Sequence, residues 1–132
     1  MQETPHPISE FKSKAGLRRV IDASRYSFQG LRCAWRSEQA FRQEVMIVVP
    51  GVLLALLLPV SDLRKLALVA VLLLVCIVEL LNSAIEAAID RISLEHHPLS
   101  RNAKDFGSAA VMLSMLVAAL TWGVIVLPFL TR

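Results

Sequence analysis

The sequence predicts an all-α fold: a polytopic membrane protein with three transmembrane helices and an N-terminal amphipathic surface helix, assembled as an oligomeric helix bundle. Hydrophobic residues make up 55% of its 132 residues, and the mean hydropathy is +0.58. Both values exceed what a soluble domain of this size needs to fill its core. The apolar residues are gathered in three blocks, and a basic amphipathic segment precedes them. We expect a single domain over residues 1–132.

The segment before the apolar blocks is expected to hold a disordered tail, residues 1–7, and a surface helix, residues 8–36. Apolar side chains such as Phe11, Phe28 and Trp35 recur there at roughly helical spacing among many Lys and Arg residues. A helix with this pattern lies on a membrane surface. On amphipathicity alone, simple anchoring to anionic lipid is the plainer interpretation. A cleavable signal peptide is not expected, because the first apolar block follows a long charged segment.

The three apolar blocks predict transmembrane helices at about 40–60, 65–90 and 106–130. The first block, "VMIVVPGVLLALLLPV", is short for a span, so its helix should begin in the preceding polar segment; Pro50 and Gly51 can kink it. The second runs from "LALVAVLLLVCIV" into an acidic stretch and covers about 25 residues, or roughly 37 Å. The third, "AAVMLSMLVAALTWGVIVLPFL", is uninterrupted and is the strongest transmembrane signal.

The distribution of basic residues predicts the orientation in the membrane. Most of the 14 Lys and Arg residues precede the first span, whereas the first connection holds only Arg64 and Lys65. Arg91, Arg101 and Lys104 lie between the second and third spans, in what we expect to be a loop. The positive-inside rule therefore places the N-terminus and the 91–104 connection in the cytoplasm, with the C-terminus outside.

The end of the second span carries a polar stripe, because "VELLNSAIEAAID" (78–90) follows an apolar run. At about 100° per residue, Glu86 and Asp90 each fall within about 20° of Glu79, and Asn82 lies about 60° to one side. Intramembrane carboxylates cost a few kcal/mol or more in lipid, so the stripe should face a protein interior or a wet cavity. Three helices offer little interior. We therefore expect self-association, helped by the small residues Ser83, Ala84, Ala87 and Ala88. The alternative is that Glu79 and Asn82 only hold helices together.

Spacing along this stripe separates two roles. The backbones of Glu79 and Glu86 should lie about 10.5 Å apart, which is long for both carboxylates to bind one metal ion. If Glu86 binds a cation at the wetter end, Glu79 remains free to accept a proton from a hydroxyl group deeper in the membrane.

Further polar residues lie beside the first and third spans, in "SEQAFRQE" (37–44) and "RNAKDFGS" (101–108). Carboxylates from several elements beside Lys and Arg residues suit a magnesium nucleotide. The chain has no GxxxxGK[ST], GxGxxG or protein-kinase signature, so such a site would not be a standard soluble one. His96 and His97 are more typical of polar loop residues than of metal ligands.

Three segments carry a resemblance to a known family: "YSFQGLRCAWRSEQAFRQE" (26–44), "VELLNSAIEAAIDRI" (78–92) and "AKDFGSAAV" (103–111). In this order, interleaved with three spans, they resemble the bacterial integral-membrane diacylglycerol kinases. The resemblance implies an enzyme that transfers the γ-phosphoryl group of ATP, with Mg²⁺, to the primary hydroxyl of diacylglycerol to make phosphatidate. It also implies a homotrimer in the bacterial inner membrane, with active sites shared between subunits and membrane lipid as a partner. A nucleic-acid partner is not expected.

The resemblance also assigns candidate site residues. Glu79 matches the catalytic general base, and Asn82 matches a polar catalytic residue beside it. Glu38 and Glu86 match the metal-binding carboxylates. The nucleotide-binding positions are Arg19, Tyr26, Glu38, Glu86, Glu95, His97, Lys104 and Asp105. The positions for the lipid substrate are Arg19, Trp35, Gln43, Glu79 and Ser108.

Two other functions fit parts of the same pattern. An undecaprenol kinase has the same architecture, and the stripe alone does not separate the two lipid acceptors. The long N-terminal surface helix and the "FRQE" stretch favour diacylglycerol. A non-enzymatic alternative is a small proton-coupled transporter whose intramembrane Glu79 binds protons and cations.

Overall fold

The computed structural model describes residues 16–131, and every regular element in this part of the chain is an α-helix. The helices are α1 (Leu17–Ser37), α2 (Gln39–Leu57), α3 (Asp62–Ile92) and α4 (Pro98–Leu130). The all-α prediction is therefore confirmed. The predicted tail and the first residues of the predicted surface helix, residues 8–15, lie outside the described residues.

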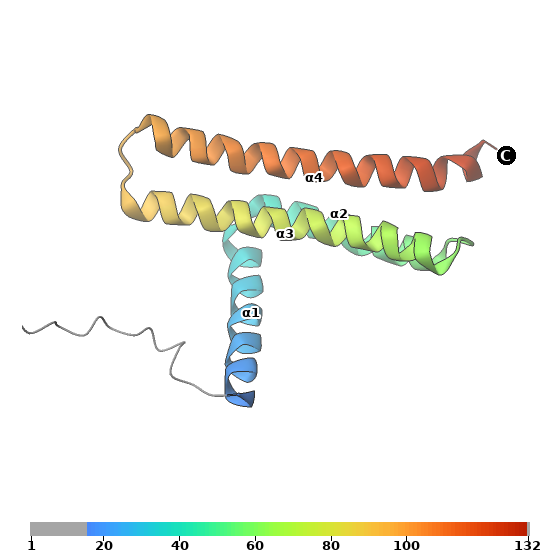
Figure 1. The fold of residues 1–132 in the computed structure, drawn as a ribbon, viewed down its shortest axis with the longest axis horizontal. Coiled ribbons are helices and arrows are strands. Elements are labelled where there is room, and N and C mark those ends of the chain that lie inside the picture. Colours follow the sequence, from blue (N-terminus) through green and yellow to red (C-terminus); the bar gives the residue numbers. More distant parts are fainter. Residues whose placement is uncertain (1–15, 132) are drawn as a thin grey trace, which may run out of the picture.

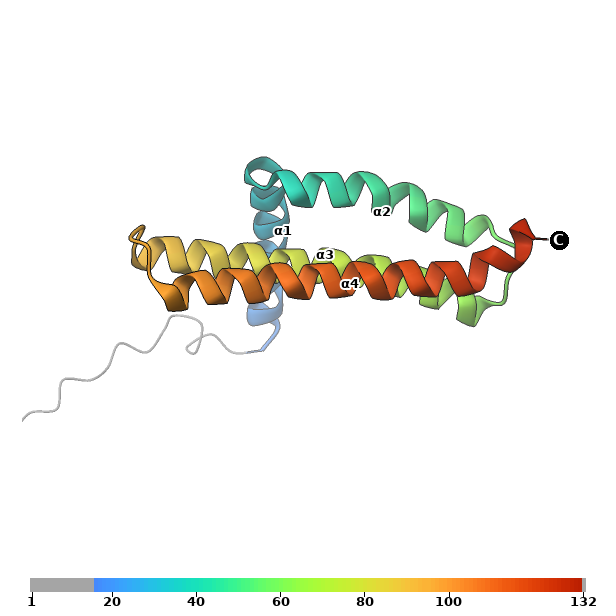
Figure 2. The same cartoon turned by 90° about the horizontal axis from the view of Figure 1, so that it is seen from above.

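Helices α2, α3 and α4 run side by side, and α1 runs across them and away from the bundle at the start of α2, part-way along α3 and α4 (Figures 1 and 2). The packed pairs are α3 with α4, α2 with α3 and, less extensively, α1 with α2. The helices α2, α3 and α4 are each long and apolar enough to cross a membrane. The chain is thus a multi-pass membrane protein with the predicted division into three spans and one separate helix.

The corner between α1 and α2 is held by one arginine. Glu38 is extended, with φ −100° and ψ 112°, so the chain changes direction there. The Arg42 Nη1 group donates hydrogen bonds to the carbonyl oxygens of Trp35 at 3.0 Å and Arg36 at 3.1 Å. These carbonyls end α1 and have no partner within the helix, so a guanidinium both satisfies them and complements the negative end of the helix dipole. The arginine thereby fixes Glu38 between two helices.

The connection between α3 and α4 is much shorter than the predicted loop at residues 91–104. Helix α3 continues to Ile92, and α4 already begins at Pro98. Proline is favoured at the first position of a helix because its φ angle is preset and no donor is lost there. The ring of His97 caps the same end, since its Nδ1 accepts a hydrogen bond from the Leu99 N–H at 3.2 Å. The loop prediction was therefore wrong for residues 91–92 and 98–104: Arg91 lies on α3, and Arg101 and Lys104 lie on α4.

The opposite end of the bundle is joined by a tryptophan. Trp122 Nε1 on α4 donates to the Leu68 carbonyl oxygen on α3 at 3.2 Å, and the Leu68 side chain is fully buried. The buried apolar residues along the bundle are few: Phe41, Val48, Ala55, Leu68, Val75 and Ala118. Most large apolar side chains of the spans point outward, as expected where lipid rather than water surrounds them.

Candidate active site

Glu79 is buried inside the single chain. Its residue is 5% exposed on the face of α3 that packs in the bundle. The carboxylates of Glu86 and Glu38 are close enough to act on it electrostatically. The sequence predicted that burying this carboxylate would need self-association. In the structure, the helices of one chain bury it without a second subunit. Burying an ionisable carboxyl group there costs free energy, so a functional role explains the position of Glu79 better than chance does.

Asn82 lies one turn after Glu79 on α3 and contacts Glu86. Its Nδ2 group donates to Glu86 Oε1 at 3.3 Å. Its Oδ1 atom is buried and has no hydrogen-bond partner among the described residues. The same amide lies directly against Gly107 of α4, where an added Cβ would overlap Oδ1. Asn82 is therefore fixed between two helices, with its carbonyl oxygen enclosed against α4.

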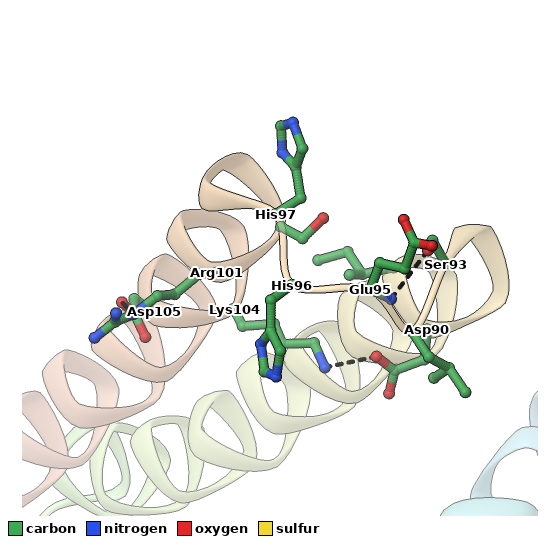
Figure 3. Close-up of a pocket in the computed structure, with 11 residues that line it drawn as sticks. Asp90, Ser93, Glu95, His96, His97, Arg101, Lys104 and Asp105 are labelled. Atoms are coloured by element: carbon green, nitrogen blue, oxygen red, sulfur yellow. Dashed lines mark hydrogen bonds and ion pairs between the residues drawn. The ribbon is translucent and has the colours of Figure 1, made fainter.

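A cavity of about 620 Å³ opens where α3 and α4 meet their connection (Figure 3). Four residues predicted for nucleotide binding line it, namely Glu95, His97, Lys104 and Asp105. Lys104 Nζ bonds Asp90 Oδ1 at 2.6 Å across the two helices. The cavity lining combines cationic, acidic and imidazole side chains. Cations can bind the phosphate groups of a ligand, and the other side chains can bond its polar groups.

The cavity residues differ in how firmly they are held. In Figure 3, the His97 ring lies apart from the Lys104–Asp90 pair, and its Nδ1 is used by the helix cap. Arg101 and Asp105 are one turn apart on α4, with Nε and Oδ2 at 3.8 Å, and both side chains are largely exposed. Glu95 is also exposed. The Lys104–Asp90 pair is the shortest of these contacts and joins two helices.

Glu38 lines a second cavity, of about 570 Å³, between α1 and α3. Its lining is mostly apolar and includes Leu31 and Ala34 from α1 and Leu80 from α3. The small residues Ser83, Ala84 and Ala87, which the sequence suggested for contacts between subunits, line this same groove. In one chain, the small-residue face of α3 therefore lies toward α1.

Several predicted site residues are not brought to the 620 Å³ cavity by one chain. Arg19 and Tyr26 are exposed on α1, the helix that leaves the bundle. The predicted lipid-contacting residues Trp35, Gln43 and Ser108 are also exposed. Exposure is compatible with a ligand dissolved in the membrane, because such a ligand reaches the protein laterally.

Glu44, the last residue of the "SEQAFRQE" segment, is a candidate residue to which the sequence assigned no role of its own. It is 6% exposed on α2, and both of its carboxylate oxygens are buried without a hydrogen-bond partner in the described structure. Its charge and that of Glu79 are within electrostatic range. The signal was available in the spacing, because Glu44 follows Phe41 by three residues and precedes Val48 by four, and both are buried.

The carboxylates fit a magnesium ion that arrives with a nucleotide. Among residues 16–131, no three His, Cys, Asp or Glu side chains converge as a ready metal site. Mg²⁺ in phosphotransfer sites is usually held by one or two carboxylates together with substrate phosphates and water. Glu86 and Glu38 are both half-buried and both lie near Glu79. Two carboxylates of this kind suit that shared coordination and do not suit a closed protein cage.

Comparison with known proteins settles the family. Residues 25–126 match the prokaryotic diacylglycerol kinase family. The chain belongs to this family. It is 51% identical over 119 residues to a diacylglycerol kinase of Pseudomonas aeruginosa, covering 90% of this chain and 97% of that protein. It is 50% identical over 107 residues to the Escherichia coli diacylglycerol kinase, covering 81% and 88%. A Haemophilus influenzae diacylglycerol kinase is 39% identical over 108 residues, covering 82% and 92%.

This membership confirms the resemblance drawn from three sequence segments and makes the chain a membrane enzyme of the lipid kinase class. A kinase of this family uses ATP as co-substrate. The matched region includes the corner at Glu38, all of α3 and the cavity between α3 and α4.

Proposed function

We propose that this protein phosphorylates the primary hydroxyl of diacylglycerol with ATP to give phosphatidate at the cytoplasmic face of the inner membrane. Glu79 is the general base, Glu38 and Glu86 hold Mg²⁺ with the nucleotide, and Asn82 completes the catalytic group. The nucleotide occupies the region of Glu95, His97, Lys104 and Asp105, with Arg19 and Tyr26 as further contacts. Trp35, Gln43 and Ser108 contact the lipid.

One observation carries this proposal: polar side chains recur along α3 from its buried part to the open charged cavity at its end. This series begins at buried Glu79, continues through the Asn82–Glu86 hydrogen bond and ends at Asp90, which holds Lys104. A lipid alcohol is soluble at the first end and a nucleotide at the last. An enzyme that joins the two needs its acceptor base on the apolar side and its phosphate-binding cations on the wet side.

The chemistry follows from what these groups can do. Phosphoryl transfer depends mainly on in-line positioning and on neutralising charge on the phosphoryl oxygens. Bound Mg²⁺ would supply much of that neutralisation. Glu79 accepts the hydroxyl proton as the acceptor oxygen forms its bond to phosphorus, and the bond to the leaving diphosphate breaks. Lys104 supplies positive charge at the phosphates. Asn82 keeps Glu86 oriented through its Nδ2 donor.

Orientation and assembly complete the proposal. The excess of basic residues before α2 supports a cytoplasmic N-terminus, which also puts the α3–α4 cavity on the side where ATP is present. A homotrimer with shared sites is supported by α1, which projects away from its own bundle and carries two predicted nucleotide contacts.

The test is phosphate transfer from radiolabelled ATP by purified protein in mixed micelles. Diacylglycerol and undecaprenol are supplied in parallel and in competition. Labelled phosphatidate in clear excess over labelled polyprenyl phosphate supports the proposal. Transfer mainly to undecaprenol would reassign the acceptor. Proton-coupled efflux by reconstituted protein, without ATP consumption, would contradict kinase function altogether.

A further inference from the structure

We infer that Asp90 is a positioning residue that holds the Lys104 ammonium at the nucleotide cavity. The inference rests on the proposed function, because it concerns how Lys104 binds phosphate. Asp90 was part of the polar stripe in the sequence, yet none of the roles above is assigned to its side chain beyond the contact with Lys104.

The contact is well defined by geometry. Lys104 Nζ and Asp90 Oδ1 are 2.6 Å apart, within the range for a strong charge-assisted hydrogen bond. The two residues are separated by 14 positions and lie on different helices, α3 and α4. Their side chains are 38% and 49% exposed, so the pair is reachable from water. Both residues line the cavity (Figure 3).

Lysine needs such a partner more than most residues do. Its ammonium is a point charge on a flexible stem with about 2 kcal/mol of rotamer entropy, and nothing in the side chain itself directs it. Asp90 reduces that freedom before the nucleotide arrives. The charge of Glu86 also acts on the same ammonium, one turn away from Asp90 on α3. Lys104 is therefore held at the cavity within electrostatic range of Glu86, the carboxylate proposed to bind the metal.

The ammonium has enough donors for both tasks. A lysine carries three N–H donors, and Asp90 accepts one of them at 2.6 Å. The remaining donors can bond phosphate oxygens without breaking the ion pair. Asp90 does not touch the reacting atoms in this arrangement, and its effect is exerted through Lys104 alone.

The experiment compares Asp90→Asn, Asp90→Glu and the control Asp62→Asn in the full-length protein. Asp62 lies at the opposite end of the same helix and is exposed, so its change is chemically matched but remote from the cavity. Steady-state KM for ATP and for diacylglycerol are measured, together with kcat. Binding of a non-hydrolysable ATP analogue with Mg²⁺ is measured separately by equilibrium dialysis.

We expect Asp90→Asn to raise the KM for ATP and the Kd of the analogue about fivefold, the upper range for an exposed ion pair. The KM for diacylglycerol should not change. Asp90→Glu should recover most of the ATP affinity, because a carboxylate on the same backbone position can still reach Lys104. In a Lys104→Met background, Asp90→Asn should have no further effect on the Kd.

The results separate this inference from the proposed function. If the wild-type protein phosphorylates diacylglycerol while Asp90→Asn leaves ATP affinity unchanged or increases it, the positioning role is overturned and the proposed function stands. Additive effects of Asp90→Asn and Lys104→Met would overturn it as well. A wild-type protein that transfers no phosphate would overturn the proposed function and this inference with it.

Discussion

Gly107 and Asn82 fit together so closely that α4 can carry no side chain at this point. A Cβ at residue 107 would overlap Asn82 Oδ1 and lie 3.2 Å from Cγ. The glycine is helical and has an ordinary φ, so space and not backbone conformation is what it provides. This contact connects α4 to the same amide that donates to Glu86. The packing of α3 on α4 and the proposed metal site are therefore linked through one residue.

Gly107→Ala should reduce activity more than its size suggests. The new methyl group must push the Asn82 amide aside, which costs about 1–3 kcal/mol of stability for an overpacked site. Because Glu86 loses its oriented partner, we expect kcat to fall between about tenfold and a hundredfold. The measurements are phosphate transfer and thermal unfolding in detergent.

Gly123→Ala is the matched control for this substitution. It changes the same residue type on the same helix, and nothing lies within 4 Å of its added Cβ. Activity should stay at the wild-type level. Equal losses in the two variants would mean that the Gly107–Asn82 contact has no special importance.

Glu79→Gln should abolish turnover without unfolding the protein. The amide keeps the size of the buried side chain but is a far weaker proton acceptor, and general-base catalysis is typically worth about 10²–10⁴ in rate. We expect kcat to fall by at least about a hundredfold, with the same elution volume in size-exclusion chromatography as the wild type. Substantial remaining activity would reject Glu79 as the base.

Glu86→Ala should change the metal requirement of the reaction. Even outer-shell partners of metal ligands change affinity by about 10–100-fold, so if Glu86 is a direct ligand as proposed, its loss should raise the Mg²⁺ concentration for half-maximal activity at least about tenfold. A Mg²⁺ titration at fixed total ATP measures this. The metal role fails if the titration curve is unchanged while kcat alone falls.

The spans could be predicted from sequence because an apolar run of this length is stable in a membrane as a spanning helix. The positions of Glu79 and Asn82 on one face also followed from helical spacing alone. The start of α4 was missed, although Pro98 suits a first helical position, because the third span was predicted from its apolar run, which begins only at residue 109.

Contacts between helices were beyond the sequence. The Lys104–Asp90 bond depends on how sharply the short connection turns, and the Gly107–Asn82 contact depends on the register of α4 against α3. Neither quantity is encoded in the periodicity of one helix. Glu44 illustrates the same limit: its helical spacing from Phe41 and Val48 is compatible with a buried position, but only packing shows that its carboxylate is buried.

Trp122→Phe should lower stability while leaving catalysis intact. The indole N–H bond to the Leu68 carbonyl joins the first turns of α3 to the last turns of α4, away from the α3–α4 connection. Its loss should cost about 0.5–1.5 kcal/mol. Thermal unfolding should shift downward, while KM for ATP and kcat below the transition remain unchanged. A changed KM for ATP would indicate coupling between the two ends of the bundle.

Two inactive variants should restore activity when they assemble together. In one chain, Glu38 and Lys104 line separate cavities, and α1 projects away from its own bundle. Suppose that a site takes Glu38 from one subunit and Lys104 from its neighbour. In an equal mixture of Glu38→Gln and Lys104→Met subunits, each of these two residues is then intact at about half of the sites. Both are intact at about a quarter of the sites, so the mixture should regain about a quarter of wild-type activity. The subunits are refolded together from denaturant and assayed against each variant refolded alone. Activity no higher than that of the separate variants would show that both residues of a site come from the same chain.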